Sequence, residues 1–205
     1  YIEDDMDQAA EIQERLIPDS QLNPKYYKLE TFYSPAKQVG GDYFDIIELS
    51  GDRCLLVIAD VSGKGYSAAL LMSNIQAMVR TLADQDFPLD RMAQFINQSV
   101  YHNSVRGKFV TIVFMQMDPH QHTLKYVNCG HNPPLMVNSE SEVTELDQAD
   151  PVLGVVEDYP CHINEIGVHL TIFSIMRIEA ADQFTFIFGA KSFPGIERIN
   201  FFGII

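Results

Sequence analysis

The spacing of apolar residues along the chain switches between the period of a helix and the period of a strand. Apolar side chains recur at helical spacing from Asp4 to Ile17, where Pro18 ends the run, and again over 68–82 and over 89–100 after Pro88. Segments rich in β-branched and aromatic residues predict strands. They are 26–33, a hairpin within 40–65, 109–117, 123–129, 135–137, 143–146 and 168–178. Because β-rich segments flank one pair of helices, this order favours an α+β sandwich with both helices crossing one sheet face.

The hairpin around the turn Ser50-Gly51-Asp52 is expected to bring two acids together. Antiparallel partners have residue numbers with a constant sum, and a turn centred on Gly51 makes Asp42 face Asp60. Facing Cβ atoms lie roughly 4.5–5.5 Å apart, and at an effective dielectric of about 20 the two carboxylates repel by on the order of 3–4 kcal/mol. Lys64 is the one Lys or Arg at the open end of the hairpin, so a hard divalent cation is the natural counter-charge. Alternatively, both acids point into water, or a one-residue slip in register separates them.

Composition narrows the class of protein. The 205 residues suit one domain, or one domain with an appendage, and a net charge of -14 argues against binding the nucleic-acid backbone. No apolar run approaches the roughly 18–20 residues of a membrane span. Three widely spaced cysteines without a CxxC pair suggest neither a disulfide framework nor a zinc knuckle, and a reducing cytoplasm is the expected location. The chain begins without Met or a signal sequence, from which we expect a fragment of a longer protein.

Two further motifs and a methionine-rich stripe each have a functional and a structural interpretation. Gly63-Lys64-Gly65 before a helix could cradle a phosphate, but it lacks the spacing of known phosphate loops, and the glycines may serve only to turn the chain. His131 lies in a Gly/Pro-bounded turn without a serine or cysteine nucleophile, so a structural hydrogen bond is expected. His120 and His122 are expected in a surface turn. The methionine-rich stripe of the two predicted helices is interpreted as core packing, with a partner-binding surface as the alternative.

Four short motifs follow one another along the chain. They are Gly40-Gly41-Asp42-Tyr43-Phe44-Asp45, Asp60-Val61-Ser62-Gly63-Lys64-Gly65, Phe109-Val110-Thr111-Ile112 and Asn128-Cys129-Gly130-His131-Asn132-Pro133-Pro134. In this order they resemble the bacterial SpoIIE/RsbU-like branch of the metal-dependent PPM serine/threonine phosphatases, over roughly residues 9 to 160. The lead-in Ile12-Gln13-Glu14-Arg15-Leu16-Ile17-Pro18 also looks like that branch, where it follows a sensor or receiver module.

The resemblance implies a fold, a reaction and a set of site residues. The fold would be a β-sandwich of two antiparallel sheets flanked by helices, and the reaction the attack of a metal-activated water on a phosphoserine or phosphothreonine. Asp42 would bind Mn²⁺ or Mg²⁺, Asp60 would bridge two metals, and the Val61 carbonyl would be a further ligand. The substrates typical of the branch are phosphorylated anti-sigma-factor antagonists of the STAS type. Residues 1–20 would then be a linker helix from an upstream regulatory module, with a possible homodimer contact, and 21–205 the phosphatase domain.

The chain departs from the family pattern after about residue 160. The family pattern has a strand that ends in an aromatic-Thr-Asp-Gly turn, whose Asp is another metal ligand, and then Glu-Ala. Here Phe173-Ser174-Ile175-Met176-Arg177-Ile178-Glu179-Ala180 lines up with it, so Ile175 and Met176 replace Asp and Gly. Three alternatives follow: an altered or truncated end of an active domain, a pseudophosphatase that binds phosphoproteins or relays signals, or replacement of the ligand by Glu179 or Asp182. Because hard cations take about six or more oxygens, Asp42 and Asp60 alone predict weak metal binding.

Overall fold

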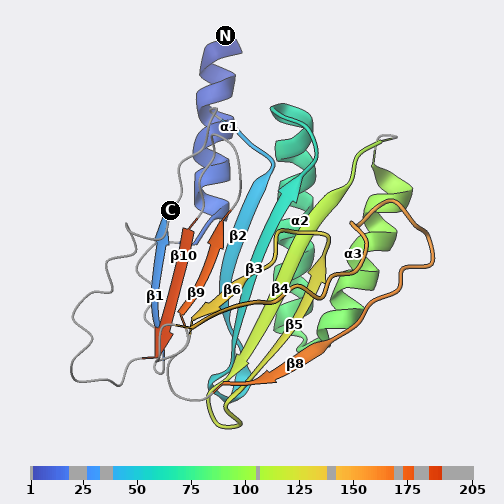
Figure 1. Ribbon diagram of the computed structural model, residues 1–205. Helices are drawn as coiled ribbons and strands as arrows, with labels where there is room; N and C mark the ends of the chain where they lie inside the picture. Colours follow the sequence, from blue (N-terminus) through green and yellow to red (C-terminus); the bar gives the residue numbers. More distant parts are fainter. Residues whose placement is uncertain are drawn as a thin grey trace.

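Two five-stranded antiparallel sheets and a helical pair make up the fold (Figure 1). The structure is a computed structural model, and it describes residues 2–18, 27–32, 39–104, 107–137, 142–168, 173–177 and 185–190. The helices are α1 (Ile2–Leu16), α2 (Tyr66–Asp84) and α3 (Leu89–Asn103), with a short 3-10 turn η1 (Ser50–Asp52). The strands are β1 (Tyr27–Phe32), β2 (Asp42–Glu48), β3 (Cys54–Val61), β4 (Val110–Asp118), β5 (Thr123–Cys129), β6 (Leu135–Val137), β7 (Val143–Glu145), β8 (Asn164–Gly167), β9 (Phe173–Arg177) and β10 (Thr185–Ala190).

The strand order separates the chain into two layers. The first sheet has the order β2-β3-β4-β5-β8, and the second has the order β1-β10-β9-β6-β7. In the first sheet β2–β3 and β4–β5 are hairpins, the connection from β3 to β4 carries α2 and α3, and β8 pairs with β5, whereas the second sheet joins β1 with the later strands β6, β7, β9 and β10. The prediction of an α+β sandwich of two antiparallel sheets is confirmed.

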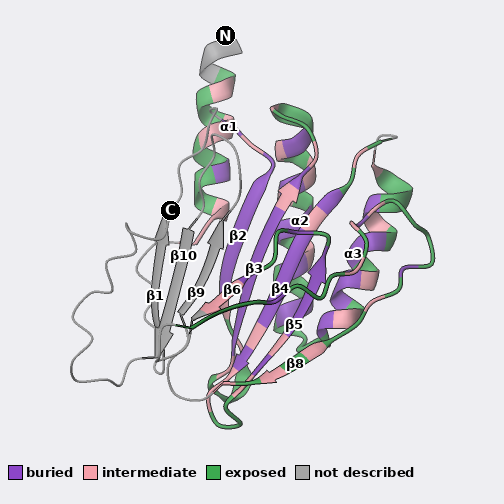
Figure 2. Ribbon diagram, viewed as in Figure 1, coloured by how far each residue is buried: buried purple, intermediate pink, exposed green. Residues whose placement is uncertain are grey.

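Alternation along β3 divides the core into two apolar clusters. Leu55, Val57 and Ala59 pack with the buried faces of α2 and α3, whereas Leu56 and Ile58 belong to a second cluster. Successive side chains of a strand point to opposite faces, and the second cluster includes residues next to the other sheet, such as Leu146. Figure 2 shows buried residues along β2 to β5 and on the sides of α2 and α3. One cluster thus lies under the helices, and the other lies between the sheets.

Most elements appear where the hydrophobic periodicity predicts them. Two helices cross one face of the first sheet, and the methionine stripe of α2 and α3 is core, since Met72 and Met92 are buried. Of the strand expected over 168–178, the structure describes β9 (Phe173–Arg177) and Val168, which follows β8; residues 169–172 and 178 lie outside the described residues. The strands β8 and β10 were not predicted. Within the part of the chain that the structure describes, no helix is both long and apolar enough to cross a membrane.

Candidate functional site

Asp42 and Asp60 face each other across the β2–β3 hairpin. They are partners in the antiparallel register, as are Glu48 and Cys54 at the other end of the pair. The turn between the strands is built by Gly51 and Asp52, both of which have positive φ angles, 72° and 60°. The predicted register is therefore confirmed, and a slip of one residue is excluded.

Both acids lie on the face of the first sheet that looks toward the second sheet. Asp42 is two residues from Phe44, and Asp60 is two residues from Ile58; both of these apolar residues belong to the cluster between the sheets. Asp42 is only 9% exposed, and Asp60 is half-buried. The pair thus sits at the rim of the space between the sheets, and the alternative in which both carboxylates point into water does not fit Asp42.

Close backbone packing holds Asp42 beside the end of β3. A Cβ atom added at Gly41 would lie 2.8 Å from the Val61 carbonyl oxygen and 3.0 Å from the Ala68 Cβ. The Val61 amide donates to the Gly41 carbonyl oxygen at 3.3 Å. Only a residue without a side chain fits between β3 and α2 here, so the glycine of the first motif allows the approach that brings Asp42 close to the backbone of Val61.

The turn at Gly63 and Gly65 redirects the chain from β3 into α2. Both glycines have positive φ angles, 96° and 76°, which other residues rarely adopt. The Lys108 ammonium donates to the Ser62 carbonyl oxygen at 2.8 Å and lies against Gly63. The structure therefore adds a second cation, Lys108, near the open end of the hairpin, where Lys64 alone was predicted.

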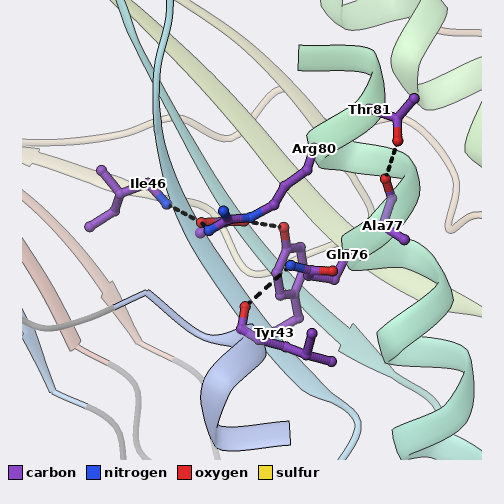
Figure 3. Close-up of polar contacts among 8 residues, drawn as sticks. Tyr43, Ile46, Gln76, Ala77, Arg80 and Thr81 are labelled. Atoms are coloured by element: carbon purple, nitrogen blue, oxygen red, sulfur yellow. Dashed lines mark hydrogen bonds and ion pairs between the residues drawn. The ribbon is translucent and has the colours of Figure 1, made fainter. Parts of the chain in front are cut away.

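The second acid of the first motif, Asp45, has a different role (Figure 3). Its carboxylate is fully buried and accepts two hydrogen bonds from Arg80 of α2, from Nε at 2.7 Å and from Nη2 at 2.8 Å. The Tyr43 hydroxyl and the Ile46 amide also donate to it, at 2.8 and 2.9 Å. Burial, and then the charge of Asp45, raises the pKa of Tyr43 well above its ordinary value. Asp45 is three residues from Asp42 on β2, so the two side chains lie on opposite faces of the strand. Asp45 therefore faces the helices, and its ion pair with Arg80 joins α2 to β2.

Helix α1 is joined to the segment that precedes Asp42. The Gln13 side chain donates to the Gly40 carbonyl oxygen at 2.8 Å and accepts from the Gly40 amide at 2.9 Å. Gln76 of α2 donates to the carbonyl oxygen of Leu16, the last residue of α1, at 3.4 Å. These contacts connect the lead-in segment of the family resemblance with the start of β2.

The last two motifs of the resemblance meet beside Asp60. Thr111 is the partner of Asp60 in the β3–β4 register, and its hydroxyl lies 2.9 Å from the Nδ1 atom of His131. His131 is only 8% exposed, and burial lowers its pKa to about 4, so the imidazole is neutral at pH 7. The expected structural hydrogen bond of His131 is confirmed, but its partner, Thr111, was not predicted.

The donor set at the rim suits a hard cation but is incomplete. Asp42 and Asp60 offer carboxylate oxygens, and Val61 offers a backbone carbonyl, which are the ligand types that Mg²⁺ and Mn²⁺ prefer. Among the residues that the structure describes, no group of three or more His, Cys, Asp or Glu side chains is arranged to hold a metal ion. The roles of Asp42, Asp60 and Val61 as ligands therefore stay predictions.

The segment aligned with the missing aspartate is a strand. Ile175 pairs with Leu135 of β6 and with Ile187 of β10, and Met176 pairs with Phe186. No turn occurs at Ile175 and Met176, where the family pattern has Asp-Gly. The two proposed replacements, Glu179 and Asp182, lie outside the described residues.

Comparison with known proteins agrees with the architecture. Protein IcfG of Synechocystis is 24% identical over 191 residues, which cover 80% of this chain and 30% of that protein. The phosphoserine phosphatase RsbU of Bacillus subtilis is 26% identical over 159 residues, which cover 77% of this chain and 47% of that protein. The chain thus spans less than half the length of these curated relatives.

Solved structures share the fold at low sequence identity. The SiaA-PP2C domain of Pseudomonas aeruginosa superposes with a TM-score of 0.71 at 16% identity, over 93% of this chain and 97% of that one. The PP2C phosphatase domain of SpoIIE from Bacillus subtilis, with a fragment of its regulatory domain, has a TM-score of 0.69 at 11% identity, over 80% of this chain and 63% of that one. The family model described as "Stage II sporulation protein E (SpoIIE)" matches residues 50–170. Since this match covers more than half of the chain, the chain belongs to the SpoIIE family of PPM phosphatase domains.

Proposed function

We propose that this chain is a Mn²⁺- or Mg²⁺-dependent phosphatase domain that hydrolyses phosphoserine or phosphothreonine in a protein. The observation that carries the proposal is the facing pair of Asp42 and Asp60 at the rim of the sandwich. Without a cation, two carboxylates at this spacing repel each other by on the order of 3–4 kcal/mol at an effective dielectric of about 20. Asp42 and Asp60 would hold a divalent ion, which would offset this repulsion and supply the phosphatase chemistry of the family.

In this reaction the residues of the chain would hold the metal ions and orient the reacting groups, and none has to act as a nucleophile. Bound ions of this type lower the pKa of a bound water and stabilise charge on phosphoryl oxygens. Asp42 and Asp60 lie opposite each other in the β2–β3 register, and the packing at Gly41 keeps the Val61 backbone next to Asp42. Lys108 places a positive charge at the Ser62 carbonyl, on the loop that leaves Asp60.

The relatives support a proposal for the substrate and the setting. RsbU and RsbP of Bacillus subtilis are phosphoserine phosphatases, and we infer that this chain acts on a phosphorylated anti-sigma-factor antagonist of the STAS type, in cytoplasmic partner-switching signalling. Helix α1 would arrive from an upstream sensor or receiver module. Its Ile12 is 63% exposed and would be available for a homodimer contact.

A second candidate is a pseudophosphatase that binds a phosphoprotein or relays a signal without hydrolysis. The observation that favours it is that Ile175 and Met176 lie within strand β9, at the positions where the family pattern has a turn with a ligand Asp. Because Asp42 and Asp60 are not joined by a third His, Cys, Asp or Glu ligand among the described residues, we expect metal binding to be weak.

The test is Mn²⁺-dependent release of phosphate from a phosphoserine protein, combined with calorimetric titration of Mn²⁺. Asp60→Asn removes a ligand charge, and Asp84→Asn, an exposed acid at the far end of α2, is the matched control. Release that requires Mn²⁺, survives in Asp84→Asn and disappears in Asp60→Asn supports the phosphatase. Binding of a phosphorylated STAS domain without hydrolysis or metal dependence supports the second candidate. Tight Mn²⁺ binding with robust release would contradict the expectation of a weak site.

A further inference from the structure

We propose that a polar pocket at the end of the first sheet remote from Asp42 and Asp60 binds a phosphate group, either as the free ion or as a monoester. The pocket has a volume of about 230 Å³ and is lined by Arg53, Gln116, Asp118, Gln121, Thr123 and Lys125. Arg53 directly precedes β3 and Asp60 lies near the end of that strand, so at about 3.3 Å per residue the two positions are roughly 20 Å apart. The pocket is therefore separate from the facing acids, and the inference does not rest on the proposed function.

The floor of the pocket is the face of the sheet that the helices cover. Successive side chains of a strand alternate between its two faces, and Phe114 of β4 belongs to the cluster under the helices. Gln116 therefore continues the same face, and its partner in the β4–β5 register is Lys125. Asp118 and Thr123 are the next pair on that face. The apolar face of the sheet thus becomes polar beyond Phe114, and these polar side chains form the floor.

Arg53 joins the pocket to the connection between α2 and α3. Leu55 belongs to the cluster under the helices, so Arg53, two residues before it, lies on the same face as the floor. The Arg53 Nη2 atom donates to the Asp86 carboxylate at 2.6 Å, and its Nε atom donates to the Ser50 carbonyl oxygen at 3.0 Å. These two bonds hold the guanidinium in one position, so a ligand that contacts it loses less affinity to side-chain ordering.

The lining offers more hydrogen-bond donors than acceptors. The Lys125 ammonium carries three donors, and its ion-pair partner Glu165 is 3.8 Å away, which is beyond hydrogen-bonding distance. Among the residues that the structure describes, neither the side-chain amides of Gln116 and Gln121 nor the Thr123 hydroxyl has a hydrogen-bond partner. A ligand that satisfies these groups therefore carries several acceptor oxygens.

Charge and size narrow the ligand to a small oxyanion. Asp118 is the acid of the lining, and its Oδ1 atom already accepts from the amides of His120 and Gln121, both at 2.9 Å. Arg53 and Lys125 thus place two positive charges in the lining of a chain whose net charge is -14. The volume is below the roughly 300–1,000 Å³ of pockets for drug-sized ligands. A phosphate group combines small size, negative charge and several acceptor oxygens, and charged donors form the stronger hydrogen bonds with it.

The test is a titration of the protein, without added metal, with inorganic phosphate and separately with O-phosphoserine, followed by ¹H–¹⁵N NMR. We expect saturable shifts of the amide signals of Gln116, Gln121 and Lys125, and an affinity that falls as NaCl is added because salt screens partly exposed charges. Saturation by inorganic phosphate alone would assign the pocket to the free ion, and saturation by both would assign it to the phosphate group of a monoester as well. Shifts that do not saturate, or that are confined to the surroundings of Asp42 and Asp60, would overturn the proposal.

Three variants separate binding in the pocket from an effect of net charge. Lys125→Met should weaken phosphate binding about tenfold or more, the loss expected for one hydrogen bond to a charged group. Gln121→Ala, in the exposed turn between β4 and β5, keeps the fold and should weaken binding about 2–10-fold. Arg15→Met removes the same charge from α1, where Arg15 pairs with Glu11 at the surface, and should leave the affinity unchanged. Equal weakening in Arg15→Met and Lys125→Met would overturn the assignment to this pocket.

Discussion

Removal of the Arg80 guanidinium is expected to be among the most damaging single changes outside the apolar core. Arg80→Met leaves the fully buried Asp45 carboxylate without its cation, and breaking a buried pair in this way costs about 3–5 kcal/mol. The Arg80 side chain is 47% exposed, so solvent already screens the pair. Asp45 also keeps the hydrogen bonds from Tyr43 and Ile46. We therefore expect a loss of about 2–3 kcal/mol in the free energy of unfolding, or roughly 4–12 °C in melting temperature for a domain of this size.

Urea denaturation monitored by circular dichroism measures this loss. Arg53→Met is the matched control, because Arg53 pairs at the surface with Asp86 at 2.6 Å, and such a pair contributes less than about 1 kcal/mol. Replacing Asp45 by Asn in the Arg80→Met protein removes the stranded charge and should recover part of the stability. A loss below about 0.5 kcal/mol for Arg80→Met would refute the view that this pair secures α2 on β2.

Two more predictions concern α1 and His131. Gln13→Ala removes both hydrogen bonds to Gly40, so it should lower the free energy of unfolding by about 1–2 kcal/mol and speed amide exchange at Gly40. The control Gln8→Ala, at an exposed position of the same helix, should change neither quantity. Equal exchange in the two variants would contradict a link between α1 and β2. For His131, the folded pKa of about 4 lies below the unfolded value of 6.5, so its contribution is complete above pH 6.5 and is lost as pH falls toward 4, by about 3 kcal/mol. The urea midpoint of wild type should therefore fall more steeply between pH 7 and 4.5 than that of His131→Gln, and parallel curves would show that burial does not hold the ring neutral.

Several features of the fold could be predicted from the sequence because short-range rules determine them. The register that opposes Asp42 and Asp60 depends on one turn at Gly51 and on the constant sum of partner numbers. The helices over 66–84 and 89–103 follow from the apolar period of 3.6 residues. Ordered motifs predicted the family, and with it the two-sheet sandwich. Each of these features can be read from a stretch of about twenty residues or from motif order.

Other features depend on which strands become neighbours, and the sequence pattern carries little information about that. β10 lies between β1 and β9, so its partner β1 comes from the opposite end of the chain. The first motif contains Asp42 and Asp45, but only packing against α2 shows that Asp45 is neutralised by Arg80, 35 residues away. Thr111 meets His131 because β4 and β5 are adjacent and Gly130 turns the chain. The sequence by itself determined the local geometry of the hairpin and the opposition of Asp42 and Asp60. Which side chains contact the acids was decided by the tertiary structure, because burying both faces of the sheet brings together residues that are far apart in the chain.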